Sequence, residues 1–224
     1  MKNKLLIVFD LDETIGYFGQ IKIIWNLIIK INNFFDDKLD KQQIFNKIMI
    51  NFKEILRPDI IKIFSYLSYY KKNIYKLILY TNNQGGRHWV SLIVNYLDSI
   101  VNKKVFDQII FPHSINNKII EKMRTSNKKD YNDLLLCSNS EKDTIVCFID
   151  DKEHFKMINK NVFIIKVNPY IKNLPWEEII SRVSKLNLID YDLSPFLSIL
   201  ENNIPLTIKE DEGYETIFNK IVYF

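Results

Sequence analysis

Two aspartates separated by one residue follow a run of five apolar residues near the start of the chain. Residues 5–9 are all apolar, a pattern typical of a strand buried in a parallel sheet, and Asp10 and Asp12 come directly after. In open α/β sheets ligands bind outside the carboxyl ends of the strands, so both carboxylates are placed for chemistry. The alternative interpretation is an acidic turn that caps the next element, which is common for an isolated Asp-x-Asp sequence.

A second apolar run, at residues 144–149, ends in another pair of carboxylates, Asp150 and Asp151. A capping role for the acids does not easily explain why two buried strands both end in a pair of aspartates. Like charges brought together at neighbouring strand ends repel each other, so such a site favours a bound cation. Hard oxygen ligands, with room for water and phosphate, suit Mg²⁺, and we expect a magnesium site at these strand ends.

A third strand is expected at residues 76–80, and it is followed by Thr81, Asn82 and a glycine-rich turn that ends at Gly86. A hydroxyl and a glycine-rich turn in front of a helix can form a cradle for phosphate, because a helix N-terminus presents unpaired N–H groups. The same residue types also serve turn geometry alone, so the pattern is weak by itself.

Strand and helix patterns alternate along the chain, which predicts an α/β fold with a parallel sheet and right-handed crossovers. Further strands are expected at 106–111 and 162–167, and helices at 58–68, 89–96, 131–136 and 175–186. Two more helical patterns, at 21–35 and 38–55, lie between the first strand and the rest. They predict an inserted lid or substrate platform, and the alternative is a pair of helices that complete the core.

The expected organisation is a core at residues 1–186 that contains the helical insert at 16–55, followed by a C-terminal extension at 187–224 that packs on the core. A net charge of +4 permits an acidic or phosphorylated partner without demanding nucleic acid. No apolar run is long enough to cross a bilayer, so no membrane partner is expected. Cys137 and Cys147 lack metal-like or redox-like spacing, which favours an intracellular, reducing compartment such as the cytoplasm or nucleus.

In this order the motifs resemble the haloacid dehalogenase superfamily of phosphohydrolases, over roughly residues 4–180. The resemblance depends on Asp-x-Asp-x-Thr from Asp10 to Thr14, on Thr81, on Lys129 and on the acid pair at 150–151. The sequences at 11–14, 56–58 (with Phe64) and 129–131 further resemble the subfamily named for the NLI-interacting factor. That subfamily includes the phosphatases of the RNA polymerase II C-terminal domain.

The resemblance implies a Rossmann-like doubly wound parallel sheet, the haloacid dehalogenase fold, and a role for each residue of the motifs. Asp10 would be the nucleophile that forms an aspartyl-phosphate, and Asp12 would protonate the leaving oxygen and then activate water. Mg²⁺ would be held by Asp10, Asp150 and the backbone carbonyl of Asp12, with Asp151 as a direct or water-mediated ligand.

The resemblance also assigns the residues that bind the phosphoryl group. Thr81, with Asn82 beside it, would donate hydrogen bonds to the phosphoryl oxygens, and Lys129 would neutralise charge on them. Lys128 adjoins Lys129 and Lys152 follows the acid pair, so three lysines remain candidates for the catalytic one. Without the resemblance, a lysine pair such as 128–129 is by default a solvated surface feature.

The expected function is a Mg²⁺-dependent phosphohydrolase, with a phosphoserine or phosphothreonine protein as the favoured substrate. The turn at 81–85 is a departure, because it is more similar to polynucleotide 3′-phosphatases and to histidinol-phosphate and sugar-bisphosphate phosphatases. A nucleic-acid 3′-phosphate or a small phosphorylated metabolite is therefore the alternative substrate. A catalytically silent protein that keeps the fold for binding is the alternative from another class.

Overall fold

The computed structural model describes residues 5–32, 40–71 and 75–186, which divide into two compact units. Of the described residues, the first unit contains 5–16, 57–71 and 75–170, and the second contains 17–32, 40–56 and 171–186. The extension expected at 187–224 lies outside the described residues. Within the described ranges, no helix has both the length and the apolar character needed to cross a bilayer.

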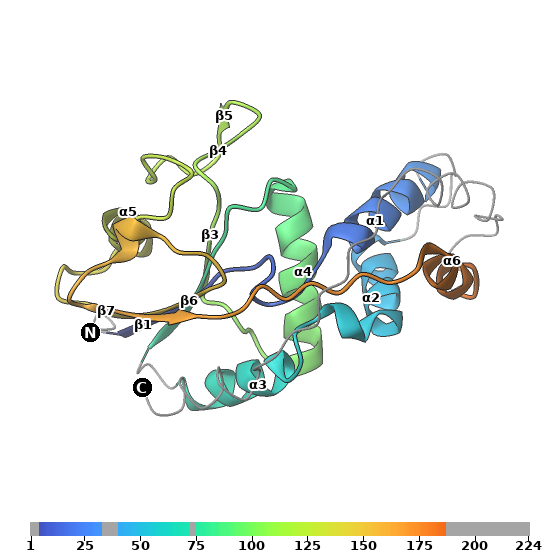
Figure 1. The fold of residues 1–224 in the computed structure, drawn as a ribbon, viewed down its shortest axis with the longest axis horizontal. Coiled ribbons are helices and arrows are strands. Elements are labelled where there is room, and N and C mark those ends of the chain that lie inside the picture. Colours follow the sequence, from blue (N-terminus) through green and yellow to red (C-terminus); the bar gives the residue numbers. More distant parts are fainter. Residues whose placement is uncertain (1–4, 33–39, 72–74, 187–224) are drawn as a thin grey trace. The chain divides into compact units, whose positions relative to one another are not determined.

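A five-stranded parallel sheet forms the centre of the first unit (Figure 1). Its strands, in spatial order, are β3 (Gln108–Ile110), β2 (Lys76–Tyr80), β1 (Leu5–Phe9), β6 (Ile145–Asp150) and β7 (Val162–Lys166). In the register of the sheet, Phe9 lies beside Leu79 on β2 and beside Ile149 on β6. The residues that follow these three strands therefore emerge side by side. Each strand lies where the sequence predicts one, although β3 covers only three of the six residues expected.

Helices cover both faces of this sheet, because side chains alternate between the two faces along each strand. Leu6 and Val8 of β1 belong to the same buried cluster as Leu134 of α5 (Tyr131–Ser138). On the other face, the ring of Phe9 packs edge-on against Phe64 of α3 (Ile60–Tyr70), with centroids 5.2 Å apart. Figure 1 shows α5 and α3 on opposite sides of the sheet. The predicted α/β class, with a Rossmann-like doubly wound parallel sheet, is confirmed.

Two local details of the first unit differ from the sequence-based expectation. The helix expected from residue 58 begins at Ile60, because Asp59 adopts a left-handed backbone conformation with φ 59°. A small antiparallel hairpin of β4 (Ser114–Ile115) and β5 (Lys118–Ile119) was not expected. Its turn is Asn116–Asn117, both with positive φ, and asparagine favours such turns.

The second unit is helical and contains α1 (Gly19–Asn32), α2 (Lys41–Asn51), the short helix η1 (Lys53–Ile55) and α6 (Trp176–Ser184). Trp25 of α1 packs edge-on against Phe45 of α2, with ring centroids 5.5 Å apart. The buried side chain of Gln20 exchanges two hydrogen bonds with the backbone of Leu174, which joins α1 to the segment before α6. The segment expected as an insert thus packs with α6, and its role as a lid stays a prediction.

Candidate active site

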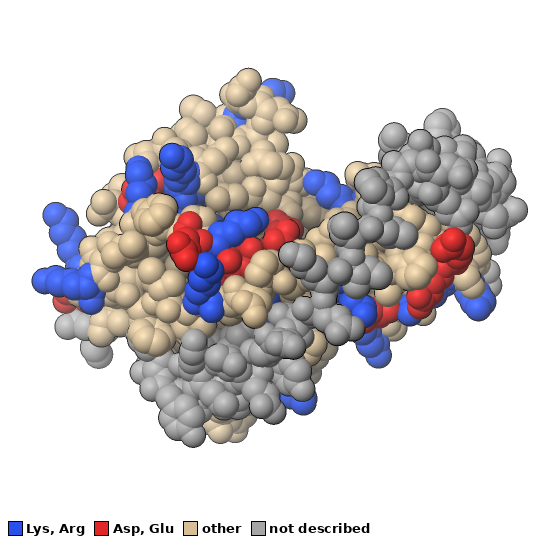
Figure 2. All heavy atoms as spheres, viewed as in Figure 1, with Lys and Arg blue, Asp and Glu red and all other residues tan. Residues whose placement is uncertain are grey.

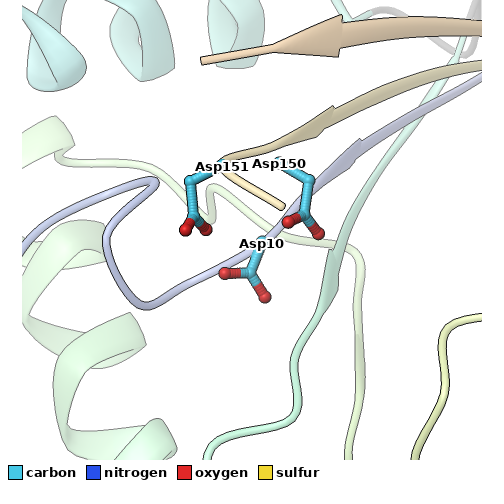
Figure 3. Close-up of side chains that lie close together, drawn as sticks. All are labelled: Asp10, Asp150 and Asp151. Carbon is cyan, nitrogen blue, oxygen red and sulfur yellow. The ribbon is translucent and has the colours of Figure 1, made fainter. Parts of the chain in front are cut away.

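Three aspartates converge where β1 and β6 end. Asp10, Asp150 and Asp151 are all buried, and one carboxylate oxygen from each lies within 4.8 Å of the others (Figure 3). The two strands are neighbours, and the backbone N–H of Asp10 donates to the carbonyl of Ile149 at 2.9 Å. The structure therefore brings the two sequence-predicted acid pairs to one edge of the sheet.

The ammonium group of Lys129 lies between two of these carboxylates. Its Nζ donates to Asp10 Oδ1 and, at 2.6 Å, to Asp150 Oδ2, and the side chain is only 1% exposed. Two aromatic rings complete its surroundings, Tyr80 at 5.7 Å and Phe148 at 5.6 Å from Nζ to the centroids. A buried ammonium group in this position offsets the repulsion between the two acids.

The other two candidate lysines are placed differently. Lys128 is exposed, and its backbone N–H donates to Ser126 Oγ. The side chain of Lys152 is 66% exposed, and its Nζ lies 4.0 Å from Glu13 Oε2 and 3.9 Å from Asp151 Oδ2. Figure 2 shows acidic and basic side chains in contact over the loops that follow β1 and β6. Only Lys129, of these three, contacts Asp10.

Burial and neighbouring charges move the pKa values of the carboxyls in opposite directions. Burial raises the pKa of Asp10 to about 7, opposed by Lys129 and reinforced by the charge of Asp150. Burial also acts to raise the pKa of Asp150, but hydrogen bonds from His154 and Lys129 outweigh it and hold that pKa below its usual range. Burial raises the pKa of Asp151 as well. One lysine is thus too little positive charge for three ionised aspartates.

One oxygen of Asp151 tests whether the site fits a metal ion. Its Oδ1 accepts a hydrogen bond from Thr14 Oγ1 at 3.2 Å, and that hydroxyl in turn accepts from the N–H of Asp151. The other oxygen, Oδ2, is buried and accepts no hydrogen bond among the described residues. A buried carboxylate oxygen without a hydrogen bond is costly. Lys152 Nζ, at 3.9 Å, lies beyond hydrogen-bond distance from it, and a cation beside Asp10 and Asp150 would supply a closer partner. The donor set therefore fits Mg²⁺, which prefers carboxylate oxygens.

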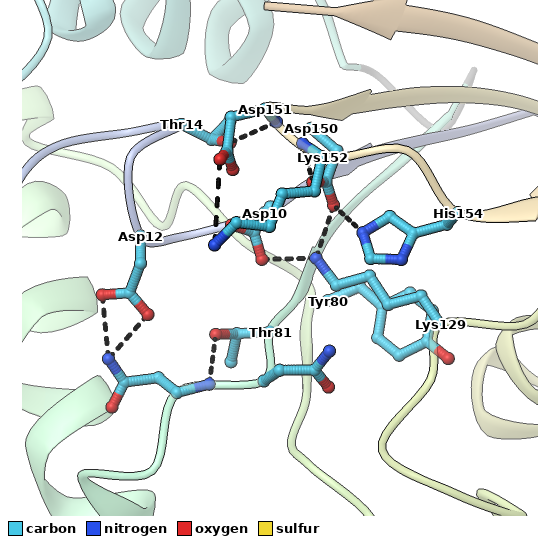
Figure 4. Close-up of polar contacts among 12 residues, drawn as sticks. Asp10, Asp12, Thr14, Tyr80, Thr81, Lys129, Asp150, Asp151, Lys152 and His154 are labelled. Carbon is cyan, nitrogen blue, oxygen red and sulfur yellow. Dashed lines mark hydrogen bonds and ion pairs between the residues drawn. The ribbon is translucent and has the colours of Figure 1, made fainter. Parts of the chain in front are cut away.

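The backbone of the loop that carries Asp12 is held by hydrogen bonds from a buried arginine. Arg57 donates through Nε to the carbonyl of Thr14 at 2.7 Å, and through one terminal nitrogen to the carbonyls of Glu13 and Asn168 at 2.7 and 2.6 Å. Glu13 has a positive φ of 61°, so the chain turns sharply there. The carboxylate of Asp12 points away from the cluster of three aspartates (Figure 4). It accepts hydrogen bonds from the side chain of Asn83.

Thr81 and Asn82 follow β2 at the same edge of the sheet. Thr81 is fully buried, and its Oγ1 accepts a hydrogen bond from the backbone N–H of Asn83 at 3.0 Å, which leaves the hydroxyl proton available to an acceptor in the site. The buried guanidinium of Arg124 donates to the carbonyls of Thr81 and Phe111 and to Asn82 Oδ1. Asn82 is therefore held with its carbonyl oxygen toward Arg124.

The structure adds two residues that sequence reasoning did not select. His154 Nε2 lies 3.1 Å from Asp150 Oδ2, and its ring packs against Phe148. Asn83 contacts Asp12, from which it is 71 residues apart in the chain. The only feature of the sequence that could have indicated the contact of His154 with Asp150 is their spacing of four residues. No pattern in the sequence indicates that Asn83 contacts Asp12.

Comparison of the chain with protein-family models, with curated proteins and with solved structures finds no match. The resemblance to the haloacid dehalogenase superfamily therefore stays a prediction that depends on the motifs.

Proposed function

We propose that the protein is a Mg²⁺-dependent phosphohydrolase that works through a phosphorylated Asp10, with phosphoserine or phosphothreonine in a protein as the favoured substrate. The observation that carries the proposal is the position of Lys129 Nζ between Asp10 and Asp150, in a cluster whose third carboxylate, Asp151, has a buried oxygen without a hydrogen bond among the described residues. Carboxylates and an ammonium group lie together at the carboxyl ends of β1 and β6. The transfer of an anionic phosphoryl group to an anionic carboxylate needs positive charge beside the nucleophile.

In the first step an oxygen of the Asp10 carboxylate attacks phosphorus, and the bond from phosphorus to the ester oxygen breaks. The departing oxygen needs a proton, and Asp12 in its acid form supplies it. Burial raises the pKa of Asp12, which favours that acid form. Lys129 and the hydroxyl of Thr81 would stabilise the charge that develops on the transferring group.

In the second step water attacks the phosphorus of the aspartyl-phosphate. Asp12, now ionised, takes a proton from that water, and the bond between phosphorus and the Asp10 oxygen breaks. Inorganic phosphate leaves, and the Asp10 carboxylate and the Asp12 acid are regenerated. The use of one carboxyl as nucleophile and another as acid and base divides a difficult displacement into two easier ones.

The residues that would hold Mg²⁺ are Asp10, Asp150 and Asp151, with the backbone carbonyl of Asp12. When bound, the ion supplies positive charge that screens the nucleophile from the phosphate and stabilises the transition state. Asp150 stays ionised for this purpose, because hydrogen bonds from Lys129 and His154 lower its pKa.

The substrate class is supported by the motifs of the chain, and the turn after β2 favours a second candidate. Similarity at residues 11–14, 56–58 and 129–131 supports a phosphoprotein, while the Thr-Asn-Asn-Gln-Gly turn at 81–85 supports a nucleic-acid 3′-phosphate or a small metabolite. Comparing the kcat/KM values for a phosphoserine peptide, a 3′-phosphorylated oligonucleotide and a sugar phosphate would separate these classes.

The proposal is tested by hydrolysis of an aryl phosphate with and without Mg²⁺, using wild type, Asp10→Asn and Asp143→Asn. Asp143 is an exposed aspartate in the turn before β6, which makes it the matched control. We expect activity that is lost with chelator and in Asp10→Asn and retained in Asp143→Asn. Wild-type activity that survives in Asp10→Asn would contradict the proposal, and a chain that hydrolyses none of these esters would favour the silent binding protein.

A further inference from the structure

The carboxylate of Asp12 is held by one side chain. Asn83 Nδ2 lies 2.9 Å from Asp12 Oδ1 and 2.8 Å from Oδ2, so a single amide group bridges both oxygens (Figure 4). Among the described residues, no other hydrogen bond reaches this carboxylate. The contact joins the loop after β1 to the turn after β2, the two segments that would bind the reacting group from either side.

The orientation of the Asn83 amide is set by its neighbours. Its Oδ1 accepts a hydrogen bond from the backbone N–H of Gly85 at 2.7 Å, and the backbone N–H of Asn83 donates to Thr81 Oγ1 at 3.0 Å. Because an acceptor must face the Gly85 N–H, the NH₂ group must face Asp12. Both polar ends of the amide are thus used, one by the turn and one by Asp12.

The absence of a side chain at Gly85 allows the Asn83 amide to lie close to the backbone of the turn. A Cβ atom at that position would lie 2.8 Å from Asn83 Oδ1 and 2.4 Å from Cδ1 of Trp89. Any side chain at Gly85 would therefore displace both the Asn83 amide and the indole. Three successive features of the turn, the hydroxyl of Thr81, the amide of Asn83 and the missing side chain of Gly85, converge on the placement of Asp12.

We propose that Asn83 is a positioning residue that aims the Asp12 carboxyl at the leaving-group oxygen and keeps it apart from the aspartates that would bind metal. The inference rests on the proposed function, because it assigns Asp12 a partner in the same reaction. A carboxyl that turned toward Asp10, Asp150 and Asp151 would join the cation site and would not protonate the ester oxygen. The hydrogen bonds from Asn83 prevent that rotation.

Asn83→Asp keeps the shape of the side chain and the acceptor for Gly85 N–H, but replaces the donor to Asp12 with a carboxylate that repels it. Asn83→Ala and Gly85→Ala remove or displace the amide by independent means. If Asn83 served the turn alone, the variants would not distinguish an ester that needs protonation from one that does not. If it positions Asp12, all three variants should lose proton transfer.

The readout is kcat/KM for two phosphate esters, which reports phosphoryl transfer to Asp10. A nitrophenyl ester has a good leaving group and needs little protonation, whereas an alkyl ester depends on it. For Asn83→Asp we expect a loss of about 10- to 100-fold with the alkyl ester and of no more than about threefold with the nitrophenyl ester. Gly85→Ala should also lower kcat/KM more for the alkyl ester than for the nitrophenyl ester.

Equal losses with both esters, or wild-type values for Asn83→Asp, would overturn the inference while leaving the phosphohydrolase intact. Thermal unfolding of each variant identifies a loss caused by misfolding, which would lower both activities together and count against a positioning role. Wild type without Mg²⁺-dependent activity toward either ester would contradict the proposed function, and this inference with it.

Discussion

Lys129 Nζ donates to Asp150 Oδ2 at 2.6 Å, and both side chains are only 1% exposed. The lysine lies directly before Asp130, whose side chain caps α5 by accepting the N–H of Asn132 at 2.8 Å. The start of a helix therefore fixes which of two adjacent lysines enters the site. A buried ammonium group shared by two carboxylates ties the chain before α5 to the ends of β1 and β6.

Lys129→Met should both destabilise the protein and abolish its activity. Removing one partner of a buried ion pair leaves carboxylates without compensation, at a cost of about 3–5 kcal/mol in the free energy of unfolding. We expect a loss of at least about 100-fold in kcat, because charge on the transferring group is no longer stabilised. Urea unfolding and aryl phosphate hydrolysis measure the two effects.

Lys128→Met is the matched control, since Lys128 is the exposed neighbour of the same type. It should change neither stability nor rate by more than experimental scatter. Equal effects of the two substitutions would show that the site does not distinguish these lysines.

Asp10→Asn should stabilise the protein in the absence of metal, and more so at high pH. Burial raises the pKa of Asp10 from an ordinary 3.8 to about 7, so the folded protein binds this proton more tightly than the unfolded chain does. Wild type therefore loses stability as the pH rises from about 4 to about 7, and an amide avoids this loss. The advantage of the variant should be larger at pH 8 than at pH 5 by about 2 kcal/mol.

Urea unfolding in the presence of chelator, at the two pH values, measures this difference. Asp143→Asn removes an exposed carboxylate and should show no such dependence on pH. A stabilisation by Asp10→Asn that is the same at both pH values, or larger at pH 5, would contradict the assigned direction of the pKa.

Mg²⁺ should raise the midpoint of thermal unfolding of the wild type. At a free Mg²⁺ concentration ten times the dissociation constant, the stabilisation is about 1.4 kcal/mol. Asp151→Asn should remove most of this effect, because Asp151 offers the one buried carboxylate oxygen of the cluster without a hydrogen bond among the described residues. Glu153→Gln changes a nearby exposed acid that pairs with Lys166, and it should leave the response to Mg²⁺ unchanged.

The sheet could be predicted from the sequence because its strands contain short apolar runs, and the carboxyl ends of three of them locate Asp10, Asp150 and Thr81. Contacts that depend on loop backbone could not be predicted. The pairing of Asn83 with Asp12 accompanies the turn at Gly85, and Lys129 enters the site directly before the cap at Asp130. The hairpin at 114–119 was missed because two-residue strands are too short for alternation to be detected.

The most direct test of the account is to look for a phosphoryl group on Asp10. Wild type and Asp12→Asn are mixed with a nitrophenyl phosphate and Mg²⁺, quenched in acid, digested and analysed by mass spectrometry. We predict a hydroxylamine-labile phosphoryl group on the peptide that contains Asp10, at higher occupancy in Asp12→Asn because its second step is slow, and none in Asp10→Asn. Turnover of the ester without this adduct, or with the phosphoryl group on another residue, would contradict the account.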